Sequence, residues 1–112
     1  MKKIITLGHS PDADDAFMFY GITKGIVKSE KFIFEHIIQD IQSLNVLAIE
    51  NKIDTTAVSA HAYTKIHNNY RVMDCGASMG DGYGPILVSK KVLDSEKGLK
   101  IAIPGKLTSA FL

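Results

Sequence analysis

The sequence has little cysteine and no long apolar run, and each of these absences excludes a class of protein. Its 112 residues include one cysteine, Cys75, so an internal disulfide is excluded and a reducing compartment is favoured. No apolar segment approaches the roughly 20 residues that cross a bilayer. The apolar residues after Lys2 and Lys3 stop at Gly8, too early for the core of a signal peptide. We therefore expect a cytoplasmic protein with no membrane partner.

An excess of charge of one sign is also missing. Thirteen Lys and Arg residues against twelve Asp and Glu residues leave a formal net charge of +1. Because so even a balance offers no broad attraction for a phosphate backbone, we expect no nucleic-acid partner. Hydrophobic residues make up 46% of the chain and charged residues 22%, which excludes disorder and suffices for a hydrophobic core.

Short apolar runs alternate along the chain with segments of helical periodicity. The order strand, helix, strand, helix, strand, helix, strand is typical of parallel crossovers that place helices on both faces of a sheet. We therefore predict an α/β fold with a doubly wound, mostly parallel sheet. The expected strands are residues 3–7, 32–38, 53–59 and 70–77, and the helices between them end near residues 24, 50 and 67. Cys75, inside the last of these strands, is interpreted as an inert core thiol.

Local signals mark the ends and faces of the first two helices. The segment Ser10-Pro11-Asp12 combines a capping side chain with a proline suited to a first helical turn, and Gly25 supplies a left-handed stop. Asp40 caps the second helix. The predicted apolar faces are Ala13, Ala16, Phe17 and Tyr20 in the first helix, and Ile41, Leu44, Leu47 and Ala48 in the second.

The composition changes after Ala77. Three glycines and a proline in residues 78–85 predict a turn-rich loop, and further strands are expected at residues 86–89 and 100–103, separated by a charged stretch. A new helix opens near Thr108 with no partner strand after it. We therefore predict an N-terminal α/β lobe at residues 1–89, and at residues 90–112 a crossover and the beginning of a second lobe that is otherwise absent.

The carboxyl ends of parallel strands are the expected binding edge, because helix N-termini and free backbone N–H groups point there. Residues 8–10, residues 57–61 and the glycine loop at residues 80–84 should meet at this edge. Ser10 and Ser59 could donate hydrogen bonds to a small ligand there, or could merely cap the helices that follow them.

Metal and cofactor motifs are absent. The four histidines, His9, His36, His61 and His67, do not share a metal-ligand spacing. Acidic residues at positions 12, 14 and 15 are interpreted as complements of a helix dipole rather than cation ligands. Gly105-Lys106 lacks the remaining P-loop residues, and the glycine loop has the wrong spacing for a dinucleotide fingerprint. We therefore expect no metal and no cofactor.

Six segments of the sequence resemble the 1,4-dihydroxy-6-naphthoate synthase family, in the same order and at similar separations. Together they extend over essentially the whole chain. The segments are Gly8-His9-Ser10-Pro11, Asp15-Ala16-Phe17-Met18-Phe19-Tyr20, Asp40-Ile41-Gln42-Ser43-Leu44-Asn45, Val58-Ser59-Ala60-His61-Ala62-Tyr63, Gly82-Tyr83-Gly84-Pro85 and Ile103-Pro104-Gly105-Lys106-Leu107-Thr108-Ser109-Ala110.

The resemblance implies a fold and an activity. The fold is a type II periplasmic-binding-protein-like fold, whose first lobe this chain would supply, truncated at the start of the second lobe. The activity is a lyase-type step of menaquinone biosynthesis by the futalosine route, in which cyclic dehypoxanthinyl futalosine becomes 1,4-dihydroxy-6-naphthoate. The implied substrate-binding residues are Ala57, Val58, Ser59, Thr108, Ser109 and Ala110, with Ser10 and Asn45 as further candidates.

The resemblance also implies what this chain does not contain. The catalytic histidine of the family lies beyond residue 112, and none of the four histidines here matches it. Because a general base must reach the proton that it removes, we expect the isolated chain to bind but not to turn over. The alternatives are a non-catalytic solute-binding protein of the same fold and a chorismate dehydratase-like relative. The oligomeric state is left open between a monomer and a homodimer.

Overall fold

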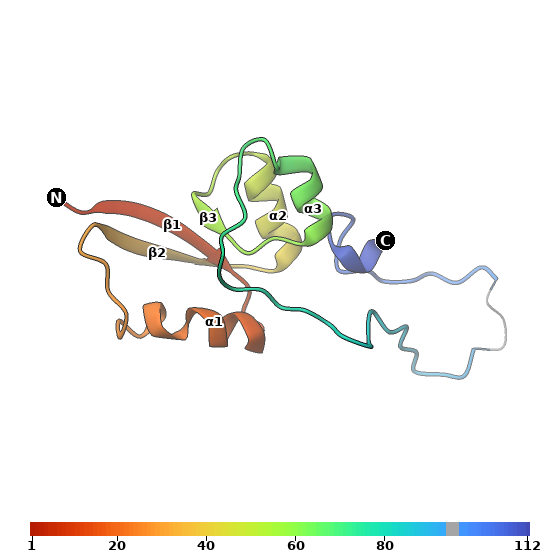
Figure 1. The fold of residues 1–112 in the computed structure, drawn as a ribbon. Helices are drawn as coiled ribbons and strands as arrows, with labels where there is room; N and C mark the ends of the chain where they lie inside the picture. The colour runs from red at the N-terminus through yellow and green to blue at the C-terminus, as the bar shows by residue number, and fades with distance from the viewer. Residues whose placement is uncertain (94–96) are drawn as a thin grey trace.

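The computed structural model describes residues 1–93 and 97–112, and it has an α/β fold built on a parallel sheet of three strands (Figure 1). The strand order is β2-β1-β3, so the first strand lies in the centre. The predicted α/β class is therefore confirmed. The elements are β1 (Lys3–His9), α1 (Ala13–Thr23), β2 (Phe32–Ile38), α2 (Ile41–Ile49), β3 (Thr55–Thr56), α3 (Ala60–Ile66) and a 3-10 turn, η1 (Ser109–Phe111).

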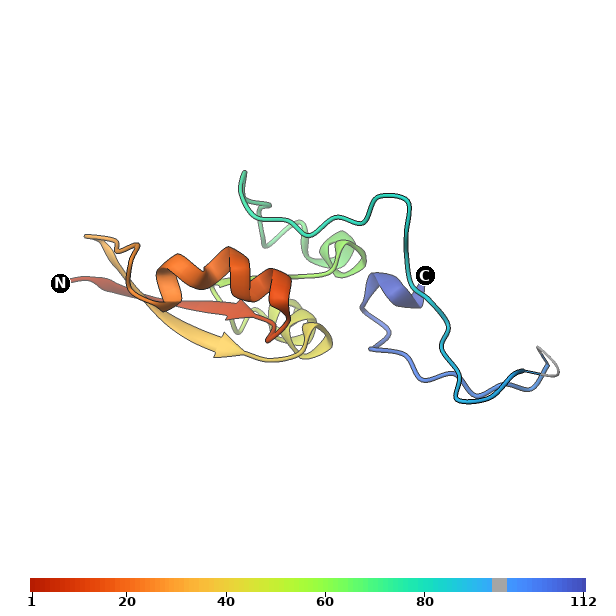
Figure 2. The same ribbon diagram turned by 90° about the horizontal axis from the view of Figure 1, so that it is seen from below.

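Helices lie on both sides of the sheet. The two views show α1 on one side of β1 and β2, with α2 and α3 on the other (Figures 1 and 2). Two of the local signals act as predicted: Asp40 accepts a hydrogen bond from the Ser43 backbone N–H, and Gly25 has a φ of +67° directly after the cap of α1. The predicted start of α1 is wrong in detail, because the Asp12 side chain makes no capping hydrogen bond and Pro11 lies before the helix. The first three predicted helices are present.

The third strand is much shorter than the predicted residues 53–59. β1 and β2 pair along their full lengths, whereas β3 pairs only through Thr55 and Thr56. Just before β3, hydrogen bonds to a side chain take the place of backbone bonds between the strands. Asp54 accepts there from the Thr6 backbone N–H at 2.9 Å and from the Thr6 hydroxyl at 2.8 Å. These bonds hold the pKa of the Asp54 carboxyl below its usual value.

The hydrophobic core fills the space between the sheet and the helices α2 and α3. It consists of Leu44, Ala48, Ile53 and Ile66, so the predicted apolar face of α2 is confirmed. Gly8 makes this packing possible, because a Cβ atom there would lie 2.6 Å from Ile53 and 2.8 Å from Leu44. The central strand can therefore approach α2 closely only at a glycine.

The predicted apolar face of α1 is wrong. Ala13, Ala16, Phe17 and Tyr20 are exposed, and Asp15 is the buried residue of this helix. Phe19 instead faces the sheet, where its ring stacks on His9 with 4.8 Å between centroids. Periodicity alone could not select this face, because apolar residues occur around the whole helix.

The strands predicted at residues 70–77, 86–89 and 100–103 are not formed. After α3 the chain is extended and pairs with no other strand in the described residues. Cys75 is consequently exposed, and the prediction of a buried thiol is wrong. A β-prone run becomes a strand only where another backbone accepts and donates its ladder hydrogen bonds. The part of the predicted crossover at residues 94–96 lies outside the described residues.

The extended segment gives the molecule an elongated shape. The radius of gyration is 16.9 Å, whereas a compact chain of this length has about 13 Å. The chain leaves the helical body after α3 and returns to it at η1, beside α3 (Figure 1). The helix predicted to open near Thr108 is thus a single 3-10 turn.

Candidate functional site

Asn45 is the centre of a polar cluster at the carboxyl edge of the sheet. Its side chain is fully buried on α2. Its Nδ2 donates to the Ser59 hydroxyl at 3.1 Å and to the Leu107 carbonyl at 3.3 Å, while its Oδ1 accepts from the Ser59 backbone N–H at 3.0 Å. One amide therefore joins three segments that are far apart in the sequence.

Residues 105–107, just before η1, are held against α2 by a second side-chain amide, that of Gln42. Gln42 Oε1 accepts the Leu107 backbone N–H at 2.9 Å. Gly105, with a φ of +152°, lies so close to Gln42 that a Cβ atom would overlap that side chain. Gln42 was not among the predicted site residues. The available signal was its position three residues before Asn45, which places both amides on neighbouring turns of one helix.

His61 connects the start of α3 to η1. Its backbone N–H donates to the Ser109 hydroxyl at 3.4 Å, and its Nδ1 lies 3.3 Å from the Thr108 carbonyl. Thr108 is buried and donates its own hydroxyl to Gly105. The structure thus brings together the predicted residues Ser59, Thr108, Ser109 and Asn45, although Thr108 is committed to the turn rather than exposed to a ligand.

The hydroxyls of Ser59 and Ser109 have the chemistry of ligand donors. Each oxygen accepts a hydrogen bond from the protein, from Asn45 and from the His61 backbone respectively. These bonds use one lone pair of each oxygen, and the hydroxyl hydrogen can donate to a carboxylate, carbonyl or hydroxyl of a small molecule. Ser59 does not cap α3 with its side chain, so the capping interpretation of this serine is wrong.

The remaining predicted site residues lie around this cluster. Ala57 is half-buried, and its N–H donates to the Gly8 carbonyl at 2.9 Å, which joins the edges of β1 and β3. Val58 packs against the hydrophobic core, and Ala110 is exposed on η1. The glycine loop at residues 80–84 is exposed, and the nearby Ser78 hydrogen-bonds Asp14 of α1 and lowers the pKa of that carboxyl.

Ser10 belongs to a second, adjoining cluster. It is buried two residues after Gly8, and its N–H donates to Asp15 Oδ2 at 2.6 Å. Its hydroxyl accepts the Asp12 N–H at 3.2 Å, and its carbonyl lies 3.2 Å from His9 Nδ1. The Ser10 backbone is therefore held from both sides. Asp15, interpreted from sequence as a dipole complement, acts instead on this turn.

Two features are missing from the described residues. Within residues 1–93 and 97–112, no three His, Cys, Asp or Glu side chains gather as metal ligands do. None of the helices in this part of the chain is long and apolar enough to cross a membrane.

Known proteins resemble this chain along nearly its whole length. The 1,4-dihydroxy-6-naphtoate synthase of Thermus thermophilus is 34% identical over 109 residues, which cover 97% of this chain and 40% of that protein. The enzyme of the same name from Streptomyces coelicolor is 23% identical over 108 residues, which cover 96% of this chain and 38% of that protein. The chain thus spans about two fifths of the length of these curated relatives.

A solved structure and a family model agree with these relatives. The crystal structure of a protein from Archaeoglobus fulgidus matches with a TM-score of 0.68 and 49% identity, over 72% of this chain and 30% of that one. The family model described as Menaquinone biosynthesis matches residues 5–112. Because this match extends over nearly every residue, including both halves of the polar cluster, the chain belongs to the menaquinone biosynthesis family.

Proposed function

We propose that this chain forms the amino-terminal, substrate-binding part of a 1,4-dihydroxy-6-naphthoate synthase. The reaction is the lyase-type conversion of cyclic dehypoxanthinyl futalosine to 1,4-dihydroxy-6-naphthoate, in the cytoplasm. The polar cluster carries the proposal, because Asn45 joins Ser59 to the segment just before Thr108 and Ser109. These are the positions that the resemblance implies as substrate contacts.

The proposed roles follow from the hydrogen bonds of the cluster. Ser59 and Ser109 donate their hydroxyl hydrogens to oxygen atoms of the substrate, while Asn45 orients Ser59. Ala57, Val58 and Ala110 place backbone around the same ligand, and Ser10 extends the site along the sheet edge. The general base is a histidine outside this chain, since none of the four histidines present matches the family position.

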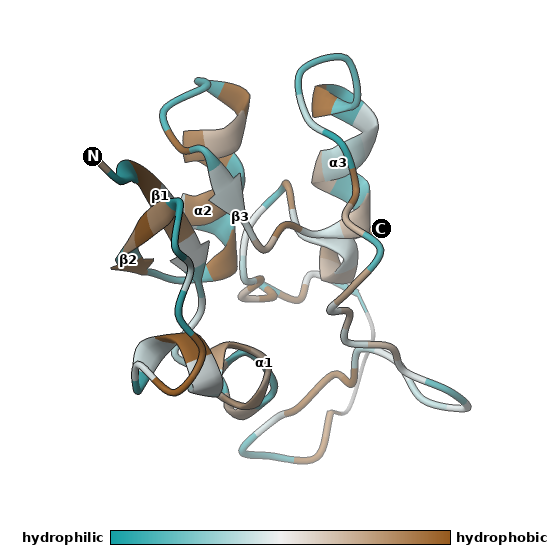
Figure 3. Cartoon of the chain, turned by 60° about the vertical axis from the view of Figure 1, so that its left-hand side comes forward, coloured by the Kyte–Doolittle hydropathy of each residue, from teal (hydrophilic) through white to brown (hydrophobic). Residues whose placement is uncertain are grey.

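The proposal includes a two-lobed, periplasmic-binding-protein-like fold, with residues 1–89 in the first lobe and residues 90–112 crossing into the second. The exposed apolar chain after α3 supports it (Figure 3). Ile86, Val88 and Ile101 are exposed, and segments 85–89 and 99–104 line an apolar hollow of about 800 Å³. The accessible surface of 9134 Å² is half as large again as the about 6,100 Å² typical of a folded chain of 12.3 kDa.

Substitution of Ser59 tests the function. Ser59→Ala in the protein that carries this chain removes one hydroxyl donor while leaving the Asn45 bond to the Ser59 backbone. We expect the Kd for cyclic dehypoxanthinyl futalosine, measured by calorimetry, to rise about fivefold or more, as the loss of one hydrogen bond predicts. Unchanged binding and turnover would remove Ser59 from the site.

Ser29→Ala is the matched control, because the Ser29 hydroxyl accepts the Phe32 N–H at the opposite, amino end of the sheet. This variant should bind like the parent protein. Binding of the substrate by the parent protein without formation of 1,4-dihydroxy-6-naphthoate would favour a solute-binding function over an enzyme.

A further inference from the structure

Two histidines from neighbouring strands form a hydrogen-bonded pair beneath α1. In the β1–β2 register Leu7 pairs with His36 and His9 pairs with Ile38, so His9 and His36 are diagonal neighbours on one face. His9 Nε2 lies 3.0 Å from His36 Nδ1. The His9 ring is 5% exposed, and it lies between His36 and the stacked ring of Phe19.

The hydrogen bonds determine which ring nitrogens carry hydrogen. His9 Nδ1 faces the Ser10 carbonyl, which can only accept, so Nδ1 of His9 is the protonated nitrogen. In the neutral ring His9 Nε2 is then an acceptor, and His36 Nδ1 must donate to it. The pair therefore forms a directed chain of hydrogen bonds from His36 through His9 to the Ser10 carbonyl.

This chain ends on a residue of the candidate site. The Ser10 carbonyl accepts from His9, while the Ser10 N–H donates to the buried carboxylate of Asp15. We propose that His9 and His36 are positioning residues that hold the Ser10 turn in its binding conformation, a role that rests on the proposed function for its effect on substrate.

The geometry accommodates one added proton but not two. A proton on His36 Nε2 leaves Nδ1 donating to His9, and the bond becomes charge-assisted. A proton on His9 Nε2, in contrast, would face the His36 N–H and remove the acceptor. The bond between the two rings therefore survives an added proton only on His36 Nε2, and the His9 Nδ1–H continues to donate to the Ser10 carbonyl.

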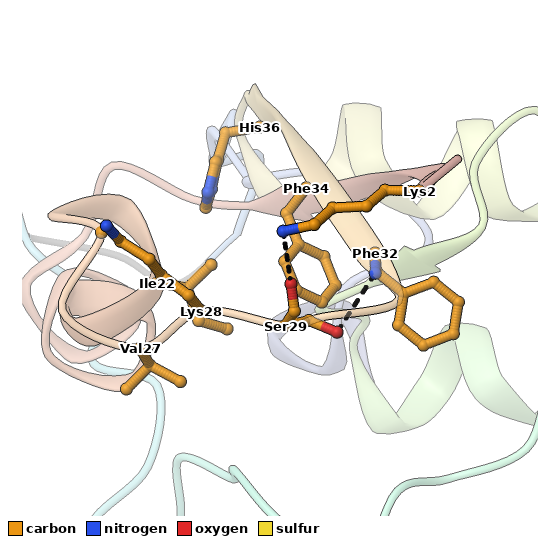
Figure 4. Close-up of a pocket in the computed structure, with 9 residues that line it drawn as sticks. Lys2, Ile22, Val27, Lys28, Ser29, Phe32, Phe34 and His36 are labelled. Atoms are coloured by element: carbon orange, nitrogen blue, oxygen red, sulfur yellow. Dashed lines mark hydrogen bonds between the residues drawn. The ribbon is translucent and has the colours of Figure 1, made fainter.

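Charged residues near the pair lie at the start of α1 and in the segments just before β1 and β2. Asp15 and Asp12 lie at the start of α1, and Asp15 bonds the Ser10 N–H. Lys2 and Lys28 line the same cavity of about 160 Å³ as His36 (Figure 4). Burial, and then the nearby His9, lower the pKa of His36 below its usual value.

The test observes the histidine nitrogens and the Ser10 amide of the protein that carries this chain by NMR. At neutral pH we expect both rings as Nδ1–H tautomers. We also expect slow exchange of the Ser10 amide with deuterium while the pair is intact. An Nε2–H tautomer of either ring would overturn the proposal.

Two substitutions separate positioning from general stability. His36→Asn retains an amide donor near the place of Nδ1, so it should keep slow Ser10 exchange. His36→Leu removes the donor and should accelerate Ser10 exchange about fivefold, as the loss of one hydrogen bond predicts. His67→Gln is the control, since His67 bonds only within its own helix end and should change neither readout. Equal exchange in His36→Leu and His36→Asn would contradict the proposal.

The readouts also distinguish this inference from the proposed function. The tautomers and the Ser10 exchange require no substrate, so they can succeed while substrate binding fails. If His36→Leu alters Ser10 exchange and also weakens substrate binding about fivefold, whereas His36→Asn restores both, positioning at the substrate site is supported. If exchange changes but binding does not, Ser10 is held by the pair yet lies outside the site, and the proposed role is wrong.

Discussion

Residues 1–70 and residues 71–104 have a similar share of apolar side chains but different structures. In the first region two strands pair along seven residues each, and Leu44, Ala48, Ile53 and Ile66 are buried together. In the second, which is richer in glycine and proline, the described residues form no helix and no strand, and Val72, Ile86 and Val88 are largely exposed. The apolar share alone therefore does not decide which region forms a core, because each strand also needs a partner.

Closure of a core depends on neighbouring elements. β1 obtains hydrogen bonds from β2 and β3, and the helices that connect these strands cover the sheet. The run at residues 86–89 meets no such strand, so its apolar side chains remain in solvent. Figure 2 shows this segment leading away from the helical body. A further layer of protein over this segment would remove the difference.

The largest expected effect contrasts one side chain from each region. Leu44→Ala empties the centre of the core and should destabilise the protein by about 3 kcal/mol. In the 112-residue chain by itself, Val88→Ala, at a position 84% exposed, should change stability by less than about 0.5 kcal/mol. Denaturant unfolding measures both values. A loss of more than about 1 kcal/mol for Val88→Ala would show a covered side chain and break the comparison.

A smaller effect is expected from the polar cluster in which Asn45 joins α2 to Ser59 and to Leu107. Asn45→Ala removes three hydrogen bonds from a fully buried side chain and should cost about 2 kcal/mol, together with substrate binding. Asn69→Ala is the control, because Asn69 bonds Asn51 on the exposed surface. Thermal unfolding and calorimetric binding are the measurements. Equal stability of the two variants would show that residues 105–109 are held by other contacts.

Tyr70 marks the boundary between the two regions. Its hydroxyl donates to the Ile53 carbonyl at 2.5 Å, and burial raises its pKa. Tyr70→Phe should cost about 1 kcal/mol, the net value of one hydrogen bond. Tyr83→Phe, in the exposed glycine loop, should have no measurable effect. If denaturant midpoints of both variants match the parent protein, the ordered region ends before residue 70.

The smallest effect concerns acid stability within the first region. The Ser43 hydroxyl, followed by its backbone N–H, lowers the pKa of the Asp40 carboxyl. A lowered folded-state pKa stabilises the protein above the unfolded value, near 3.8, and this contribution disappears as pH falls through the folded value. Asp40→Asn keeps a cap without this ionisation, so its Tm should decrease less between about pH 5 and about pH 2.

Asp40→Ala serves as the comparison for this titration, because it removes the cap at every pH. Its Tm should be lower than that of Asp40→Asn across the whole range. If the parent protein and Asp40→Asn show the same Tm slope in acid, the carboxylate does not contribute to the pH dependence.

Much of the fold and part of the site could be predicted from local patterns. The strand at residues 32–38 and the face of α2 follow from side-chain period, which depends on neighbours a few residues apart. The face of α1 could not be predicted from the sequence of the helix. Phe19 faces the sheet because it contacts His9, which lies outside this helix. Asn45 was identified as a site residue, but its bonds to Ser59 and Leu107 depend on residues 14 and 62 positions away.

The α/β class, the first three helices and the first two strands follow from the amino-acid sequence, because they depend on local propensity, periodicity and capping. The candidate site residues came from the family resemblance, and Gln42 was not among them. Only the tertiary structure decided that β3 is short, that residues 70–77, 86–89 and 100–103 form no strands, and that His9 meets His36. Strand pairing and side-chain networks require partners distant in sequence, and those partners are defined only when the chain has folded.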